Sequence, residues 1–89
     1  MLKITHGTGF HMTFKNEWTI SVQFGRGNYC DKRMKGNENN EPIYDCENAE
    51  IAIWNGKNGK LYDFGMDTVQ GWCSADEVAE WISKVSQWK

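Results

Sequence analysis

The chain has 89 residues, a formal net charge of −2 at pH 7 and an aromatic content of 13 %, including five tryptophans. This length predicts a single domain, residues 1–89, whose one small core depends on large aromatic side chains. The weak negative charge excludes a general nucleic-acid-binding protein, which needs a basic surface, and also a strongly acidic DNA mimic.

The amino terminus and the cysteines indicate an intracellular protein. The first residues contain no apolar run of signal-peptide length, and no later window could span a bilayer. The three cysteines, Cys30, Cys46 and Cys73, are odd in number and widely spaced, which argues against the disulfide framework of a secreted domain. We therefore expect a soluble protein in a reducing compartment, the cytoplasm, with no membrane contact.

Two strands are predicted in the first third of the chain. Residues 9–14 and 18–24 alternate large apolar with polar side chains, as expected for strands with one buried face. The turn between them contains Asn16, which tolerates a left-handed backbone, so the two strands should form a β-hairpin. Residues 1–8 remain unassigned.

Residues 25–48 are predicted to form one long connection. It contains the only proline, and its first half is basic whereas its second half is acidic. Long connections within small domains are often functional. The interpretation we favour is a solvated loop whose two halves attract each other, and a dedicated binding surface is the alternative.

The second half of the chain predicts another hairpin and a helix. Residues 49–54 and 60–64 should be strands joined by a turn that holds two Asn-Gly pairs, and residues 66–72 an irregular link. Ser74 and Glu77 have the spacing of a capping box, which starts an amphipathic helix over residues 75–88. The expected fold class is α+β: a four-stranded antiparallel sheet of two hairpins, with the C-terminal helix packed on one face.

No catalytic or cofactor motif of high specificity is present, so we expect neither an enzyme nor a cofactor. A metal site built from the three cysteines and a histidine is not expected, because no Cys-x-x-Cys pair occurs. Cys30 lies among cationic residues, as reactive cysteines do, and with His11 as a base it is the one candidate nucleophile.

Several segments together resemble small bacteriophage and prophage accessory proteins. The segments that carry the resemblance are Gly9-Phe10-His11-Met12-Thr13-Phe14, Trp18 to Gly25, Gly27-Asn28-Tyr29-Cys30-Asp31, Ala49 to Trp54, and Val69-Gln70-Gly71-Trp72 with Ala75-Asp76-Glu77-Val78-Ala79. The resemblance implies a bacterial host and an action through binding a host protein, as anti-CRISPR and other anti-defence inhibitors do.

The expected function is therefore a non-enzymatic inhibitor that binds a bacterial defence protein or nuclease complex through a protein–protein interface. A small-ligand or nucleic-acid binding module that uses the cationic loop 26–35 is the alternative, although nucleic acid is not the expected partner. Edge strands and spare tryptophans are also compatible with a homodimer. The candidate contact residues are Arg26, Tyr29, Lys32, Arg33, Lys35, Glu38, Glu41, Asp45, Trp54 and Trp72.

Overall fold

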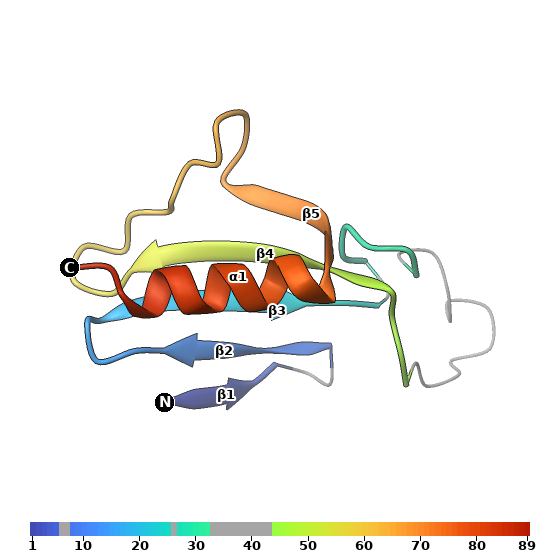
Figure 1. Ribbon diagram of the computed structural model, residues 1–89, viewed down its shortest axis with the longest axis horizontal. Helices are drawn as coiled ribbons and strands as arrows, with labels where there is room; N and C mark the ends of the chain where they lie inside the picture. The colour runs from blue at the N-terminus through green and yellow to red at the C-terminus, as the bar shows by residue number, and fades with distance from the viewer. Residues whose placement is uncertain (6–7, 26, 33–43) are drawn as a thin grey trace.

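The computed structural model describes residues 1–5, 8–25, 27–32 and 44–89. Its elements are β1 (Leu2–Ile4), β2 (Gly9–Thr13), β3 (Trp18–Gln23), β4 (Asn48–Asn55), β5 (Val69–Ser74) and α1 (Ala75–Ser86). The strands form one antiparallel sheet in the order β1-β2-β3-β4-β5, and α1 packs against β3, β4 and β5 (Figure 1). The predicted α+β class with a C-terminal helix on an antiparallel sheet is confirmed, but the sheet has five strands, not four.

The core lies between the middle of the sheet and α1. Ile20 of β3 lies opposite Ile53 of β4, and Val22 lies opposite Ile51, so that four β-branched side chains form one patch. Each of them is at most 2 % exposed, and Val85 of α1 is fully buried with them. Full burial of one such side chain stabilises the fold by roughly 1.5–3 kcal/mol. The alternation in β3 thus produces the apolar surface that the helix covers.

The predicted strand over residues 60–64 is wrong. After the turn, this segment makes only one isolated bridge to β4 and then leaves the sheet. Its two aromatic side chains account for the departure: the rings of Tyr62 and Phe64 lie 5.8 Å and 5.1 Å from the ring of Trp81 on α1. Packing against the helix buries part of each ring, and a later segment of the chain occupies the outer edge of β4.

That later segment is β5, which replaces the irregular link predicted for residues 66–72. The register shifts within it, because Gly71 and Trp72 together lie opposite the single residue Glu50 of β4. Two residues against one form a β-bulge, which interrupts the period-two alternation by which a strand is predicted. The other three predicted strands are confirmed to within one residue at each end.

The predicted capping box is confirmed at the start of α1. The backbone N–H of Glu77 donates to Ser74 Oγ (3.2 Å), and the backbone N–H of Ser74 donates to Glu77 Oε1 (3.0 Å). Both bonds with Ser74 hold the pKa of Glu77 below its usual value, and the bond from the backbone N–H of Ser74 has the larger effect. The helix ends at Ser86, two residues earlier than predicted. Within the described residues, no helix has the length and apolar content that crossing a membrane requires.

Asn16, in the turn between β2 and β3, holds the other end of α1. Its Nδ2 donates to the carbonyl oxygens of Val85 (2.8 Å) and Trp88 (2.7 Å), and its Oδ1 accepts from the backbone N–H of Trp18 (3.0 Å). The last carbonyls of a helix have no partner within the helix. The Asn16 amide bonds one of them, that of Val85, and also the carbonyl of Trp88 just beyond the end of α1. The positive φ of this turn falls on Glu17 (72°) and not on Asn16. Asn16 therefore acts through its amide.

Replacing Asn16 with aspartate should lower the free energy of unfolding by about 1–3 kcal/mol, because two carbonyls lose their donor and face a carboxylate. Urea unfolding followed by tryptophan fluorescence measures this change. Asn58→Asp is the matched control, since among the described residues the Asn58 side chain bonds only through Oδ1, which accepts from the N–H of Lys60 (2.8 Å). An equal loss of stability in both variants would contradict the role of the Asn16 amide.

Candidate functional site

Tyr29 and Trp72, two of the predicted contact residues, form an exposed aromatic pair. Their ring centroids lie 5.6 Å apart with an interplanar angle of 25°, so the rings are stacked. Tyr29 is 40 % exposed and Trp72 is 57 % exposed. A pair of stacked rings at the surface offers a large apolar area that is already ordered before any partner arrives. We call Tyr29 and Trp72 the aromatic platform.

The backbone of β5 positions the aromatic platform. The N–H of Trp72 donates to the carbonyl oxygen of Tyr29 (2.8 Å), which attaches residues 27–32 to the outer edge of β5. Gly71 permits this approach, since a Cβ on it would lie only 2.5 Å from Tyr29 Cβ. Trp72 has a φ of 51°, a left-handed conformation that is strained for a bulky residue. The bulge and the strained backbone together aim the indole away from the regular sheet.

The described charges near the aromatic platform are mainly negative. Asp31 follows Tyr29 by two residues, its carboxylate accepts from the backbone N–H of Glu47, and Glu50 lies opposite Trp72 in the sheet. Lys32, the described cation of this segment, forms an ion pair with Asp45, which raises the pKa of Lys32. The predicted contact residues Lys32 and Asp45 are therefore brought together and neutralise each other.

Trp54, the third aromatic among the predicted contact residues, lies in a separate pair. Its ring makes an edge-to-face contact with His11, with centroids 5.0 Å apart. His11 is paired with Ser21 and Trp54 with Thr19, so the two rings meet across β3 on the face of the sheet opposite α1. They cover Thr19 and Ser21, which explains why these two small polar residues are nearly buried. Burial, and then the charge of Lys3, lower the pKa of His11, so this imidazole is neutral at pH 7.

Five of the predicted contact residues lie outside the described part of the chain. The remaining five are described, and they divide into the aromatic platform, the Lys32–Asp45 ion pair and Trp54. The five outside the described residues are Arg26, Arg33, Lys35, Glu38 and Glu41.

The structure separates the three cysteines into a pair and a single thiol. Cys30 is 2 % exposed, and its Sγ accepts from the N–H of Gly25 (3.1 Å) and donates to the carbonyl of the same residue (3.3 Å). Cys46 Sγ lies beside Cys30 and donates to Asp31 Oδ1 at 2.7 Å. Among the described residues, no imidazole forms a hydrogen bond with Cys30. The alternative of a Cys30 nucleophile with His11 as its base therefore has no support in the geometry.

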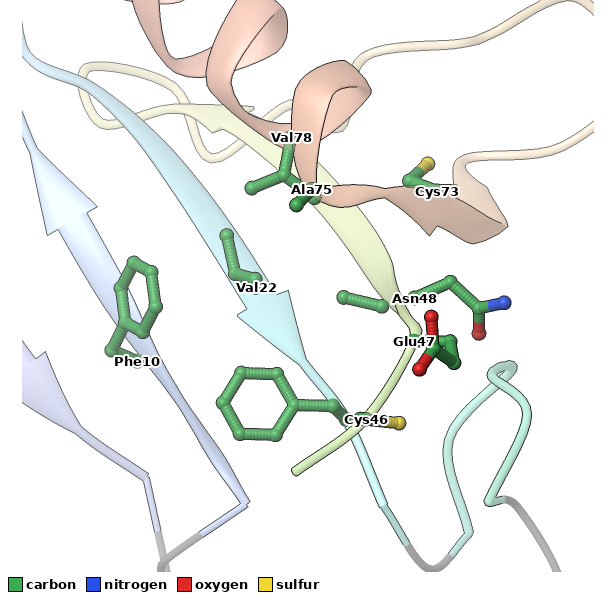
Figure 2. A pocket seen from close by; sticks show the side chains of 10 residues that line it. Phe10, Val22, Cys46, Glu47, Asn48, Cys73, Ala75 and Val78 are labelled. Atoms are coloured by element: carbon green, nitrogen blue, oxygen red, sulfur yellow. The ribbon is translucent and has the colours of Figure 1, made fainter. Parts of the chain in front are cut away.

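An apolar pocket of about 240 Å³ opens between the start of α1, the end of β3 and the segment before β4. Figure 2 shows Phe10, Val22, Val78 and Cys46 among the side chains around it. Cys73 lies at its rim, and burial, with a smaller effect of Glu77, raises the pKa of this thiol to about 11. Cys73 is therefore protonated at neutral pH and behaves as a small apolar side chain.

Two residues were not predicted as parts of the site: one positions the aromatic platform, and the other lies between Cys30 and Cys46. Gly71 makes room for Tyr29, and its position directly before Trp72 was the signal in the sequence that a close approach takes place there. Asp31 joins two cysteines that are 16 residues apart, and no local pattern could have indicated this.

The chain matches no protein family, no curated protein and no solved structure in the comparisons made.

Proposed function

We propose that this protein acts by binding another protein through a surface centred on the aromatic platform, and that it catalyses no reaction. The observation that carries the proposal is an indole that is 57 % exposed although its backbone is strained at a φ of 51°. Neither property is explained by core packing, because so exposed a side chain contributes little burial. Strained residues cluster at functional sites, and tryptophan and tyrosine are enriched among the residues that dominate binding energy in protein interfaces.

The rigidity of the aromatic platform supports a role in binding. Tyr29 is fixed by the Trp72 N–H bond and by its contact with Gly71, so little conformational entropy remains to be lost when a partner binds. A platform that is ordered in the free protein can fill a pocket on the partner as one unit. The polar side chains of Asp31, Lys32 and Asp45 would then belong to the rim of the interface.

The local charge favours a protein partner over nucleic acid. Asp31 lies two residues after Tyr29, and Lys32, the cation within residues 27–32, is paired with Asp45. Nucleic-acid grooves combine stacking rings with free cations, and residues 27–32 supply no unpaired cation beside the aromatic platform. The resemblance to phage accessory proteins makes a bacterial defence complex the first partner to test. In this role the protein would block nucleic-acid access or a conformational step of that complex.

The test is capture of partners from a bacterial lysate that contains defence complexes, with and without nuclease, followed by affinity measurement on the captured subunit. We expect one defence-complex subunit in stoichiometric amount after nuclease treatment. Trp72→Ala should weaken its binding at least about 30-fold, the effect of removing a central aromatic anchor worth roughly 2 kcal/mol. Gly71→Ala should also weaken binding, since the added Cβ displaces Tyr29.

Leu61→Ala is the matched control, because Leu61 is a similarly exposed apolar side chain (46 %) outside the aromatic platform. Its affinity should equal that of the wild-type protein. Unchanged binding by Trp72→Ala would contradict the proposed surface. Recovery of nucleic acid alone, with affinity that falls steeply as salt rises, would instead favour the nucleic-acid binding module.

A further inference from the structure

Three side chains of the kind that bind metal ions meet where the connection between β3 and β4 begins and ends. Cys30 and Asp31 come from its start and Cys46 from its end, and the ligand atoms of all three lie within 4.8 Å of one another. Both cysteines are free thiols. The proposed protein interface does not use this cluster, which we call the Cys-Asp-Cys cluster.

Backbone groups hold the Cys-Asp-Cys cluster in place. The N–H of Gly25 points at Cys30 Sγ (3.1 Å), and the N–H of Glu47 points at both carboxylate oxygens of Asp31 (3.2 and 3.3 Å). The N–H of Asp31 in turn donates to Asn48 Oδ1 (2.7 Å). Hydrogen bonds from backbone groups that orient the ligand side chains are typical of metal sites.

The Sγ of Cys46 points at the Asp31 carboxylate, at 2.7 Å, so that the two side chains share one small space with Cys30. A disulfide would use only the two sulfurs, and the Asp31 carboxylate would take no part in it. An ion would use all three groups. The third ligand is therefore the observation that favours a metal over a thiol pair.

The ligand types select the metal. Thiolates are poor ligands for Mg²⁺ and Ca²⁺, which prefer oxygen, whereas two thiolates and one carboxylate suit Zn²⁺. Tetrahedral zinc has bonds of about 2.3 Å to sulfur and about 2.0–2.2 Å to oxygen, which places two sulfur ligands about 3.8 Å apart. Since the ligand atoms of the cluster lie within 4.8 Å of one another, the two sulfurs need to approach by at most about 1 Å to reach this spacing. We infer that Cys30, Asp31 and Cys46 form a Zn²⁺ site, with water in the fourth position.

Binding of Zn²⁺ would replace two S–H bonds by two Zn–S bonds and release two protons to solvent. Because both thiols must lose their protons to bind the ion, affinity for Zn²⁺ should increase as pH rises. The ion would also fasten the two ends of the connection and so hold the segment that carries Tyr29.

The experiment adds Zn²⁺, or Co²⁺ as a spectroscopic substitute, to the reduced, metal-free full chain in competition with a chromophoric chelator. We expect one ion per chain, proton release, a higher melting temperature, and the absorption bands of tetrahedral Co²⁺ with thiolate ligands. Cys46→Ala and Asp31→Asn should each weaken binding by more than the roughly 10- to 100-fold caused by loss of an outer-shell group. Cys73→Ala is the control and should bind like the wild-type protein.

Cys30→Ala also removes a buried side chain, so the two variants with more exposed side chains decide the test. Circular dichroism of each metal-free variant confirms that it is folded. Binding by Cys46→Ala or Asp31→Asn as tight as that of the wild-type protein would overturn the site. So would a wild-type chain that binds no Zn²⁺ and instead forms a Cys30–Cys46 disulfide when treated with glutathione disulfide. Either result leaves the proposed protein interface to be judged by its own variants.

Discussion

Replacing Ile53 with alanine is expected to lower the free energy of unfolding by about 2–5 kcal/mol. Ile53 is fully buried in β4, opposite Ile20 of β3 and beneath the helix. The substitution removes three methyl or methylene carbons and leaves a cavity in close-packed surroundings that cannot collapse fully. Since a small domain has a total stability of only about 5–15 kcal/mol, this one change removes a large share of it.

Urea unfolding measures this effect, and two control variants make it specific. Ile53→Val should cost about 0.5–1.5 kcal/mol, because only one methylene is lost. Leu61→Ala, at a side chain that is 46 % exposed, should cost much less than Ile53→Ala. A loss below about 1 kcal/mol for Ile53→Ala would show that the space between β3, β4 and α1 is not the principal core.

Gly9→Ala should lower the free energy of unfolding by about 3 kcal/mol, at the upper end of the range for overpacking. Gly9 begins β2 opposite Gln23, and a Cβ on it would lie 2.0 Å from the carbonyl oxygen of Val22. That oxygen belongs to the backbone of β3, so no flexible side chain can move aside. The start of β2 must separate from the end of β3, and the pairing of β1 with β2 weakens with it.

Gly59→Ala is the control for Gly9→Ala. Gly59 has a φ of 71° and open space around the position of its Cβ, so alanine there costs only the left-handed backbone, about 1–2 kcal/mol. Thermal unfolding ranks the two variants, and amide chemical shifts show where the structure changes. Equal losses, or shifts in Gly9→Ala that spare the ends of β2 and β3, would contradict the steric account.

The aromatic platform and the Cys-Asp-Cys cluster lie on neighbouring residues of one short segment. Tyr29 stacks on Trp72, whereas the next two residues, Cys30 and Asp31, meet Cys46. A change that separated Cys30 and Asp31 from Cys46 would therefore also free the neighbouring Tyr29, one of the two rings of the aromatic platform. If both proposals hold, removal of Zn²⁺ should weaken partner binding, whereas a partner that binds equally well without the ion would show that the two sites act independently.

Local patterns in the sequence determined the parts of the fold that depend on neighbours along the chain. The alternation in β2, β3 and β4 reflects the pleat of a strand, so each of these strands was predicted to within one residue at either end. The start of α1 followed from the spacing of Ser74 and Glu77, because a capping box is closed within four residues. Tyr29 and Trp72 were predicted only as separate contact residues, Tyr29 in the cationic loop and Trp72 as a spare tryptophan.

Only the tertiary structure decided which segment occupies the outer edge of β4. Residues 60–64 were predicted as a strand, but the half-buried rings of Tyr62 and Phe64 pack against Trp81 of α1, and a bulge at Gly71 and Trp72 interrupts the pattern of the true strand. The stacking on Tyr29 and the meeting of Cys30 with Cys46 likewise join residues far apart in the chain. Which of these contacts form depends on how the elements of the whole domain pack together, and a local sequence pattern does not specify that packing.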